Sequence, residues 1–224
     1  MFNDETGSSD TIRSLIVYGG GGHGKTLLEL VQAAGIFRVA GIVDDGLVPG
    51  SDILGVPVLG GSAVLRDLCD RGIRLAVNGV GGINHVDVRS KVFELLAQAG
   101  FDCPAVVHPT AFIEPSARLE DGVQVLALSY ISSEARIGFG TVINAGVVVS
   151  HDCILGKVVN LSPGAMLAGG VVVEDYAQVG MAATINLNIT IGRYARIGNG
   201  ATVKKDVPAG TVVHAGSIWP PRSD

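Results

Sequence analysis

The chain has 224 residues, of which 47% are hydrophobic and only 17% charged, and it contains 32 glycines. This composition is typical of a globular, glycine-rich protein and excludes a disordered chain. The formal net charge of -5, without any basic cluster, argues against a nucleic-acid-binding protein.

The N-terminal segment MFNDETGSSD is acidic and polar, the reverse of a signal peptide, and we expect residues 1–12 to form a disordered tail. No apolar run reaches the roughly 18 residues that a membrane-spanning helix needs. Cys69, Cys103 and Cys153 are odd in number and lack metal-ligand spacing, which favours reduced thiols. The sequence therefore predicts a cytoplasmic protein with no membrane partner.

Residues 13–108 alternate between strand-like and helix-like segments. The strand-like segments are 14–18, 38–45, 53–60 and 73–80, and the helix-like segments are 25–35, 63–72 and 85–100. Such alternation indicates a short, doubly wound, Rossmann-like α/β domain.

A glycine-rich loop joins the first strand to the first helix. Gly19, Gly21 and Gly24 fit G-x-G-x-x-G, and Asp44 and Asp45 follow about 20 positions later, as in the dinucleotide fingerprint. Glycines at a helix N-terminus offer backbone N–H groups to any diphosphate, so NAD and a nucleotide-sugar both fit. Because the domain is short for a complete dinucleotide fold, we favour phosphate binding without a hydride-transfer cofactor.

The C-terminal half carries a six-residue repeat. Every sixth residue from Ile113 to Val203 is Ile, Leu or Val, and the position four residues after each of them is nearly always small or β-branched. A period of six matches neither an α-helix nor a flat strand. It predicts a triangular coil of about 18 residues, in which one aliphatic side chain per face points inward and successive coils stack roughly 4.8 Å apart.

The repeat defines a β-helix domain over residues 109–207, followed by a C-terminal cap or tail over 208–224. Glycines such as Gly138 and Gly156 follow the inward residue, where we expect the corner to favour a residue without Cβ. Gly169 comes 18 residues after His151, so it should lie one coil above that histidine, about 5 Å away.

Several motifs together resemble the NeuD/PglD-type sugar acetyltransferases, which comprise sialic-acid acetyltransferases and N-acetyltransferases of UDP- or GDP-linked 4-amino sugars. The motifs are Y-G-G-G-G-H-G, V-D-D, N-G-V-G with Arg89 after it, H-P-T-A, the hexapeptide repeat, and Ser150-His151-Asp152-Cys153-Ile154-Leu155-Gly156. The resemblance implies a left-handed parallel β-helix and a homotrimer. It also implies that the α/β domain binds the nucleotide-sugar and that acetyl-CoA binds between two subunits.

The resemblance assigns His151 as the general base and Asp152 as the residue that orients or polarises it. Imidazole suits this role because its charge changes near neutral pH and a sugar amine must lose a proton as it attacks the thioester. We further hypothesise that the backbone N–H of Gly169 faces the thioester oxygen as an oxyanion donor.

The resemblance also supplies two sets of binding residues. For the nucleotide-sugar they are Gly20, Gly21, Gly22, His23, Asp44, Asp45, Gly79 and Arg89; for acetyl-CoA they are Asn160, Gly169, Gly180, Met181, Gly198, Asn199 and Lys204.

Three of these assignments leave alternatives open. His23 either contacts the nucleotide-sugar or is a simple turn residue. Asn160 stands where many relatives carry a second histidine, and its amide can bind the cofactor but cannot titrate. Lys204 and Lys205 suit CoA phosphates or form a solvated lysine pair. Outside the assigned sets, Trp219 caps the coil or touches the adenine, and we favour the cap.

Other functions compete with this interpretation. A zinc-dependent carbonic anhydrase of the same fold needs three converging histidines, and only His151 lies within the coils, so we expect no metal. An O-acetyltransferase of sialic acid or another sugar is the second choice, and a non-catalytic nucleotide-sugar-binding scaffold is the third. The sequence does not identify the nucleotide base.

Overall fold

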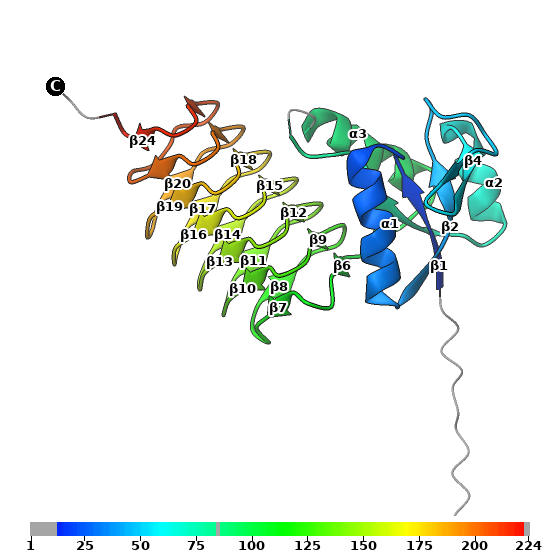
Figure 1. The fold of residues 1–224 in the computed structure, drawn as a ribbon, viewed down its shortest axis with the longest axis horizontal. Coiled ribbons are helices and arrows are strands. Elements are labelled where there is room, and N and C mark those ends of the chain that lie inside the picture. The colour runs from blue at the N-terminus through cyan, green and yellow to red at the C-terminus, as the bar shows by residue number, and fades with distance from the viewer. Residues whose placement is uncertain (1–12, 84–85, 222–224) are drawn as a thin grey trace, which may run out of the picture.

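The computed structural model describes residues 13–83 and 86–221, and the N-terminal segment 1–12 predicted as a tail lies outside them (Figure 1). The chain forms an α/β domain followed by a left-handed parallel β-helix that extends away from it. The elements of the α/β domain are β1 (Arg13–Tyr18), α1 (Gly22–Ala34), β2 (Phe37–Val43), β3 (Asp52–Ile53), β4 (Val56–Gly60), the 3₁₀ turn η1 (Ser62–Val64), α2 (Leu65–Asp70), β5 (Leu75–Asn78) and α3 (Val86–Gln98).

The sheet of the α/β domain has the strand order β3-β4-β2-β1-β5. Strands β4, β2, β1 and β5 are parallel, whereas β3 pairs antiparallel with β4. The segment 53–60, predicted as one strand, is therefore interrupted: Leu54 and Gly55 both have left-handed φ angles, of 53° and 79°, and turn the chain back into a hairpin.

Alternate residues of the central strand β1 face opposite layers of the domain. Leu15 and Val17 pack with α1, whereas Ile16 and Tyr18 pack with α2 and α3. Because both faces of β1 are covered by helices, its buried part, residues 15–18, is continuously apolar and does not alternate. The core on the α1 side continues into the β-helix through Val106, Leu126 and Val142.

Three parallel sheets form the walls of the β-helix, and we name each after its first strand. The β6 sheet contains β6 (Val106–Val107), β9 (Gln124–Val125), β12 (Val142–Ile143), β15 (Asn160–Leu161), β18 (Gln178–Val179), β21 (Arg196–Ile197) and β23 (Val212–Val213). The β7 sheet contains β7 (Phe112–Ile113), β10 (Tyr130–Ile131), β13 (Val148–Val149), β16 (Met166–Leu167), β19 (Thr184–Ile185), β22 (Thr202–Val203) and β24 (Ile218–Trp219). The β8 sheet contains β8 (Arg118–Leu119), β11 (Arg136–Ile137), β14 (Ile154–Leu155), β17 (Val172–Val173) and β20 (Thr190–Ile191).

The strand register confirms the predicted coil. Tyr130 lies opposite Val148, and Val148 lies opposite Met166, so each residue stacks on the residue 18 positions later. The second residue of each strand points inward, and residues such as Ile131, Val149 and Leu167 form one continuous buried core. The last coil is shorter, because Thr202 pairs with Ile218.

The corners of the coil depend on two different backbone requirements. From Leu119 to Ile197, the third residue after each inward residue has a left-handed φ. This position holds Gly140 (67°) in one corner but Asp152 (59°) and even Val158 (52°) in others. Gly138 has no such φ. It lacks a side chain because a Cβ there would lie 2.7 Å from the carbonyl carbon of Gly156 in the next coil. Close stacking of the coils therefore explains the glycine that follows the inward residue.

Strand pairing extends the β-helix beyond the predicted range 109–207. At the start, β6 pairs with β9, and at the end β23 and β24 pair with β21 and β22. Trp219 packs against the core, and its indole N–H donates to the Asp206 carbonyl at 3.0 Å. The tryptophan therefore closes the last coil, as a cap does.

The longest described helices have 13 residues, and no helix within 13–83 and 86–221 combines the length and apolar character needed to cross a membrane.

We predict that shortening one of the inward residues of the core destabilises the β-helix. Ile143 is fully buried, so Ile143→Ala should lower the free energy of unfolding by about 2–5 kcal/mol, and Ile143→Val by about 0.5–1.5 kcal/mol. Chemical denaturation followed by circular dichroism measures both. Ile36→Ala, at an exposed site, is the control and should change stability by less than about 0.5 kcal/mol. Equal losses of unfolding free energy in the buried and exposed variants would contradict a core built from the inward residues.

Candidate active site

His151 and Asp152 lie together at the corner between the β7 and β8 sheets, which we call the His151 corner. The His151 Nδ1 is 2.7 Å from the Asp152 Oδ2, and both side chains are largely exposed, at 60% and 64%. A carboxylate can only accept, so the contact favours a proton on Nδ1. Nε2 then keeps a free lone pair, which is the arrangement of a general base.

Gly169 lies directly against the His151 ring in the next coil, as the 18-residue spacing predicted. A Cβ at Gly169 would be 2.5 Å from the His151 Cε1 and 2.6 Å from its Nε2. The Gly170 N–H donates to the His151 carbonyl at 2.9 Å, whereas the Gly169 N–H has no acceptor within the described part of the chain. The imidazole therefore lies against a residue whose backbone N–H is not used within the described part of the chain.

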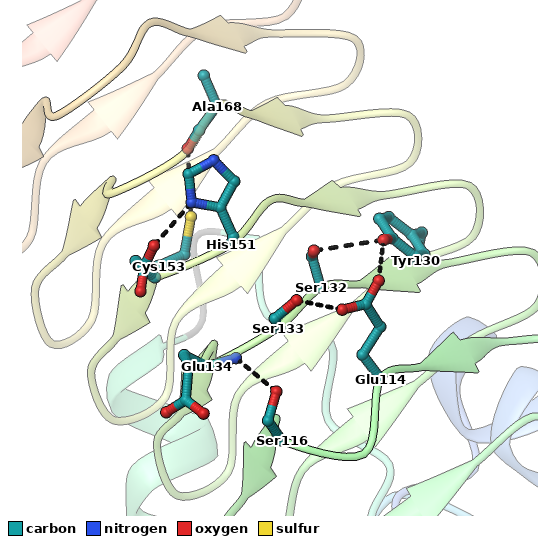
Figure 2. Close-up of polar contacts among 10 residues, drawn as sticks. Glu114, Ser116, Tyr130, Ser132, Ser133, Glu134, His151, Cys153 and Ala168 are labelled. Atoms are coloured by element: carbon teal, nitrogen blue, oxygen red, sulfur yellow. Dashed lines mark hydrogen bonds and ion pairs between the residues drawn. The ribbon is translucent and has the colours of Figure 1, made fainter.

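A second polar group occupies the same corner, in the coils below His151 (Figure 2). Tyr130 and Ser133 donate their hydroxyl hydrogens to the Glu114 carboxylate. These hydrogen bonds, Ser133 first and Tyr130 second, lower the pKa of Glu114. A fixed negative charge therefore stands below the imidazole.

The glycine loop at the end of β1 is open on one side and tightly packed on the other. A Cβ at Gly21 or Gly22 would meet nothing within 4 Å. At Gly24 it would lie 2.0 Å from the Gly19 carbonyl oxygen, and at Gly79 2.4 Å from the same atom. Gly24 and Gly79 therefore bring the backbones of β1, α1 and β5 together, and Gly21 and Gly22 face the open side.

Asp44 and Asp45 are both engaged by hydrogen bonds at the end of β2. Asp44 accepts from the Gly20 N–H at 2.7 Å and from the Gly46 N–H at 2.8 Å, so it holds the start of the glycine loop. Asp45 accepts from the Tyr18 hydroxyl and from both the backbone and the hydroxyl of Ser62. These bonds, the one from Tyr18 first, lower the pKa of Asp45, while burial and Asp45 raise that of Tyr18.

His23 lies in the first turn of α1 but contacts the β-helix. Its Nε2 lies 2.8 Å from the Gln124 Oε1, and the Gln124 amide N–H donates to the Asn78 carbonyl at 2.9 Å. Burial, followed by the positive charge of Arg89, lowers the pKa of His23 to about 4, although the Gln124 contact partly opposes the shift. The imidazole is therefore neutral at pH 7.

Arg89 is placed inside the protein and not at an open surface. Its side chain is 1% exposed, and its guanidinium donates to the carbonyls of Asn78, Val80 and Gly140. Burial lowers the pKa of Arg89, but an arginine in a protein stays charged. The side chain therefore joins α3 and β5 to the β-helix, and backbone carbonyl groups occupy its N–H donors.

Asn160 is also enclosed. It is 3% exposed, its amide donates to the Ser162 hydroxyl at 3.2 Å, and the Gly82 backbone lies against it, because a Cβ there would be 2.3 Å from the Asn160 Oδ1. The loop after β5 therefore covers this position within the chain.

The other residues assigned to acetyl-CoA fall into two groups. Gly169 and Lys204 lie on the His151 corner, whereas Gly180, Met181, Gly198 and Asn199 lie on the corner between the β6 and β7 sheets, which we call the Asn199 corner. A groove of about 300 Å³ runs along the Asn199 corner and is lined by Ser162, Gly180, Arg196, Gly198 and Asn199, with Ile83 from the α/β domain. The β7 sheet separates the two groups, so one chain alone does not bring them together.

Comparison with known proteins supplies the family. A family model described as the PglD N-terminal domain matches residues 14–96. A variant of perosamine N-acetyltransferase from Caulobacter crescentus, in complex with CoA and GDP-perosamine, is 35% identical over 92% of this chain and 95% of its own, with a TM-score of 0.86. The chain belongs to the NeuD/PglD-type sugar acetyltransferases. The predicted fold and family are thereby confirmed.

Two further structures are similar to this acetyltransferase over nearly their whole length. The acetyltransferase domain of PglB from Neisseria gonorrhoeae, in complex with acetyl coenzyme A, is 32% identical, covers 92% of this chain and 98% of its own, and has a TM-score of 0.83. WeeI from Acinetobacter baumannii is 28% identical, covers 94% and 99%, and has a TM-score of 0.80. Curated protein sequences gave no match.

Sequence reasoning missed two features of this acetyltransferase. Glu114 with Tyr130 and Ser133 could have been found, because Ser133 precedes His151 by one 18-residue coil. Nothing in the sequence pointed to Gln124, because its contact with His23 joins two different domains. Within residues 13–83 and 86–221, no group of three His, Cys, Asp or Glu side chains could hold a metal ion.

We predict that the stability of the enzyme decreases as the pH falls from about 6.5 towards 4. In this window the unfolded chain binds a proton at His23 and the folded chain does not, so the free energy of unfolding falls by up to about 1.4 kcal/mol per pH unit. His23→Gln should flatten this slope in chemical denaturation between pH 7 and 5. His214→Gln, at an exposed histidine, should leave the slope unchanged. An unaltered slope in His23→Gln would contradict a neutral imidazole at this position.

Proposed function

We propose that this enzyme is an acetyl-CoA-dependent N-acetyltransferase that acts on the amino group of a nucleotide-linked 4-amino-4,6-dideoxy sugar. The observation that carries the proposal is the His151 imidazole, which Asp152 holds through Nδ1 and whose Nε2 lies against Gly169 in the next coil. The similarity to a protein crystallised with CoA and GDP-perosamine supports the choice of donor and acceptor.

The proposed reaction is a direct transfer. The sugar amine attacks the thioester carbonyl carbon and gives up a proton to the His151 Nε2. Asp152 stabilises the imidazolium that forms, and the Gly169 N–H donates to the oxygen that becomes negative. The C–N bond forms and the C–S bond breaks. CoA leaves as a thiol after it takes the proton from the imidazolium.

Two features of the chain support the choice of a nucleotide-sugar and acetyl-CoA as substrates. Gly21 and Gly22, at the N-terminus of the 13-residue helix α1, offer backbone N–H groups on an open side to a diphosphate. The groove on the Asn199 corner contains Gly180, Gly198 and Asn199 of the residues assigned to acetyl-CoA. The Asn199 Oδ1 is held by the Met181 N–H at 2.9 Å, which keeps the groove wall ordered.

We further propose that the active site is completed in a homotrimer. The two groups of acetyl-CoA residues face away from each other across the β7 sheet, so a neighbouring subunit must supply one of them. The exposed apolar side chains on this sheet and its two corners include Phe112, Leu128, Met166, Met181, Leu187 and Ile218. Such a surface is typical of a contact between subunits.

The cytoplasm remains the expected location of this enzyme. All three cysteines are free thiols in the structure, and two of them are buried. That state is compatible with a reducing compartment.

The decisive measurement is thiol release from acetyl-CoA with a panel of UDP-, GDP- and dTDP-linked 4-amino sugars. We predict turnover with one of them and a decrease in kcat of about 10²- to 10⁴-fold in His151→Ala, because the general base is lost. His108→Ala is the matched control; His108 lies at the domain junction, bound to Thr110, and its variant should keep full activity.

Each other outcome of this assay has its own meaning. Turnover that survives His151→Ala would leave His151 a positioning role only. Turnover with sialic acid or another sugar hydroxyl, and with no amine, would favour O-acetylation. Nucleotide-sugar binding without any turnover would favour a scaffold.

Gly169 provides a separate prediction. Gly169→Ala places a methyl group 2.5 Å from the His151 ring carbon, so the imidazole must move and kcat should fall at least about tenfold with little change in folding. Steady-state kinetics and thermal denaturation of the same preparation test this. A correctly folded Gly169→Ala protein with unchanged turnover would contradict the steric constraint that Gly169 places on the imidazole.

A further inference from the structure

A buried polar connection joins the α/β domain to the β-helix beside the glycine loop. Gln124 belongs to β9 and is 1% exposed. Its Oε1 lies 2.8 Å from the His23 Nε2, and its amide N–H donates to the Asn78 carbonyl, at the end of β5, over 2.9 Å. The connection therefore links α1, β5 and β9 through one amide side chain.

The direction of each hydrogen bond in this connection follows from the Asn78 carbonyl. A backbone carbonyl oxygen can only accept, so the Gln124 amide must turn its NH₂ group towards it. The Gln124 carbonyl oxygen consequently faces His23. Since this oxygen is also only an acceptor, the His23 Nε2 must carry the hydrogen.

The remaining nitrogen of His23 is left with a lone pair. The imidazole is neutral at pH 7, because it is partly buried and the Arg89 guanidinium disfavours a second positive charge. Among the described residues, none donates to the His23 Nδ1. This nitrogen is therefore an acceptor without a partner, on the loop whose Gly21 and Gly22 face the open side.

We propose that Gln124 is a positioning residue that holds His23 in its neutral, Nε2-protonated form, so that Nδ1 accepts a hydrogen bond from the sugar part of the nucleotide-sugar. The donor is a hydroxyl or amino group. A diphosphate at neutral pH offers only acceptors, so the Nδ1 lone pair repels it. This inference rests on the proposed function, because it names the part of the acceptor that His23 contacts.

The proposal divides the loop into two parts. The backbone N–H groups of Gly21 and Gly22 bind the anionic diphosphate, and the His23 side chain recognises the sugar. The β-helix thus helps to select the sugar, although Gln124 itself is enclosed and touches no substrate.

The protonation state of His23 can be observed directly by NMR of the full-length protein labelled with ¹⁵N-histidine, with His23→Gln to assign the signals. At pH 7 we expect a protonated Nε2 and an unprotonated Nδ1 in the wild type. In Gln124→Glu the carboxylate should hold a second proton on the imidazole and raise the pKa of His23. Gln32→Glu, the same change at an exposed site of α1, is the control and should leave the His23 signals unchanged.

Binding of GDP-perosamine and of GDP alone, measured by calorimetry, tests the contact with the sugar. Protonation of Nδ1 converts the acceptor into a donor, so Gln124→Glu should weaken GDP-perosamine binding about tenfold and leave GDP binding unchanged or tighter. Gln124→Met, which removes the polar group without adding charge, should show a smaller loss in the same direction.

Three results would overturn the proposal: a proton on Nδ1 in the wild type, equal weakening of both ligands, or altered thermal stability with an unchanged ratio of the two affinities. The last is the result of a merely structural domain contact. If the wild type bound neither ligand and none of the UDP- or dTDP-linked amino sugars of the assay panel, the acceptor assigned under the proposed function would be wrong. The sugar contact would fall with it, and the imidazole spectra would still decide whether Gln124 sets the form of His23.

Discussion

The backbone ladder between successive coils is the constraint on which the rest of this molecule depends. Each strand pairs with the strand 18 residues later, so a residue's neighbours above and below are fixed by its number. His151 therefore lies above Ser133 and below Gly169. In this fold, the neighbours of a corner residue are the residues 18 positions before and after it. Substitutions at those two positions can therefore change its surroundings without an insertion loop.

The contact between the α/β domain and the β-helix is the second determinant of the site. Apolar residues such as Val106 and Val142 continue the α1-side core across the contact, and Phe93 packs on Phe139 with ring centroids 4.7 Å apart. Arg89 and Gln124 add directional hydrogen bonds to carbonyls on the other side. Buried polar groups of this kind are costly to leave unpaired, so they fix one orientation of the two domains. The glycine loop of the α/β domain is therefore held at one fixed position relative to the coils of the β-helix.

Much of the fold followed from periodicity, because a repeat of six residues leaves few other structures. The stacking of Gly169 on His151 could be predicted for the same reason. The environment of Arg89 and Asn160 could not, since both are enclosed by partners from the other domain, Arg89 at Gly140 and Asn160 at Gly82. The hairpin of β3 and β4 was missed because Leu54, in the left-handed region, is an unusual turn residue. The division of the acetyl-CoA residues between two corners follows from the triangular cross-section, which sequence spacing alone does not display.

A stack of identical coils is in principle an open-ended polymer, since the edge strands of its final coil present free N–H and C=O groups to any further strand. In this chain the α/β domain covers the first coil, and Trp219 packs on the apolar end of the last. Pro220 and Pro221 follow at once and have no backbone N–H to donate. The two ends of the β-helix thus carry features that disfavour the addition of another strand. We therefore expect the short C-terminal segment that completes the core also to oppose end-to-end association.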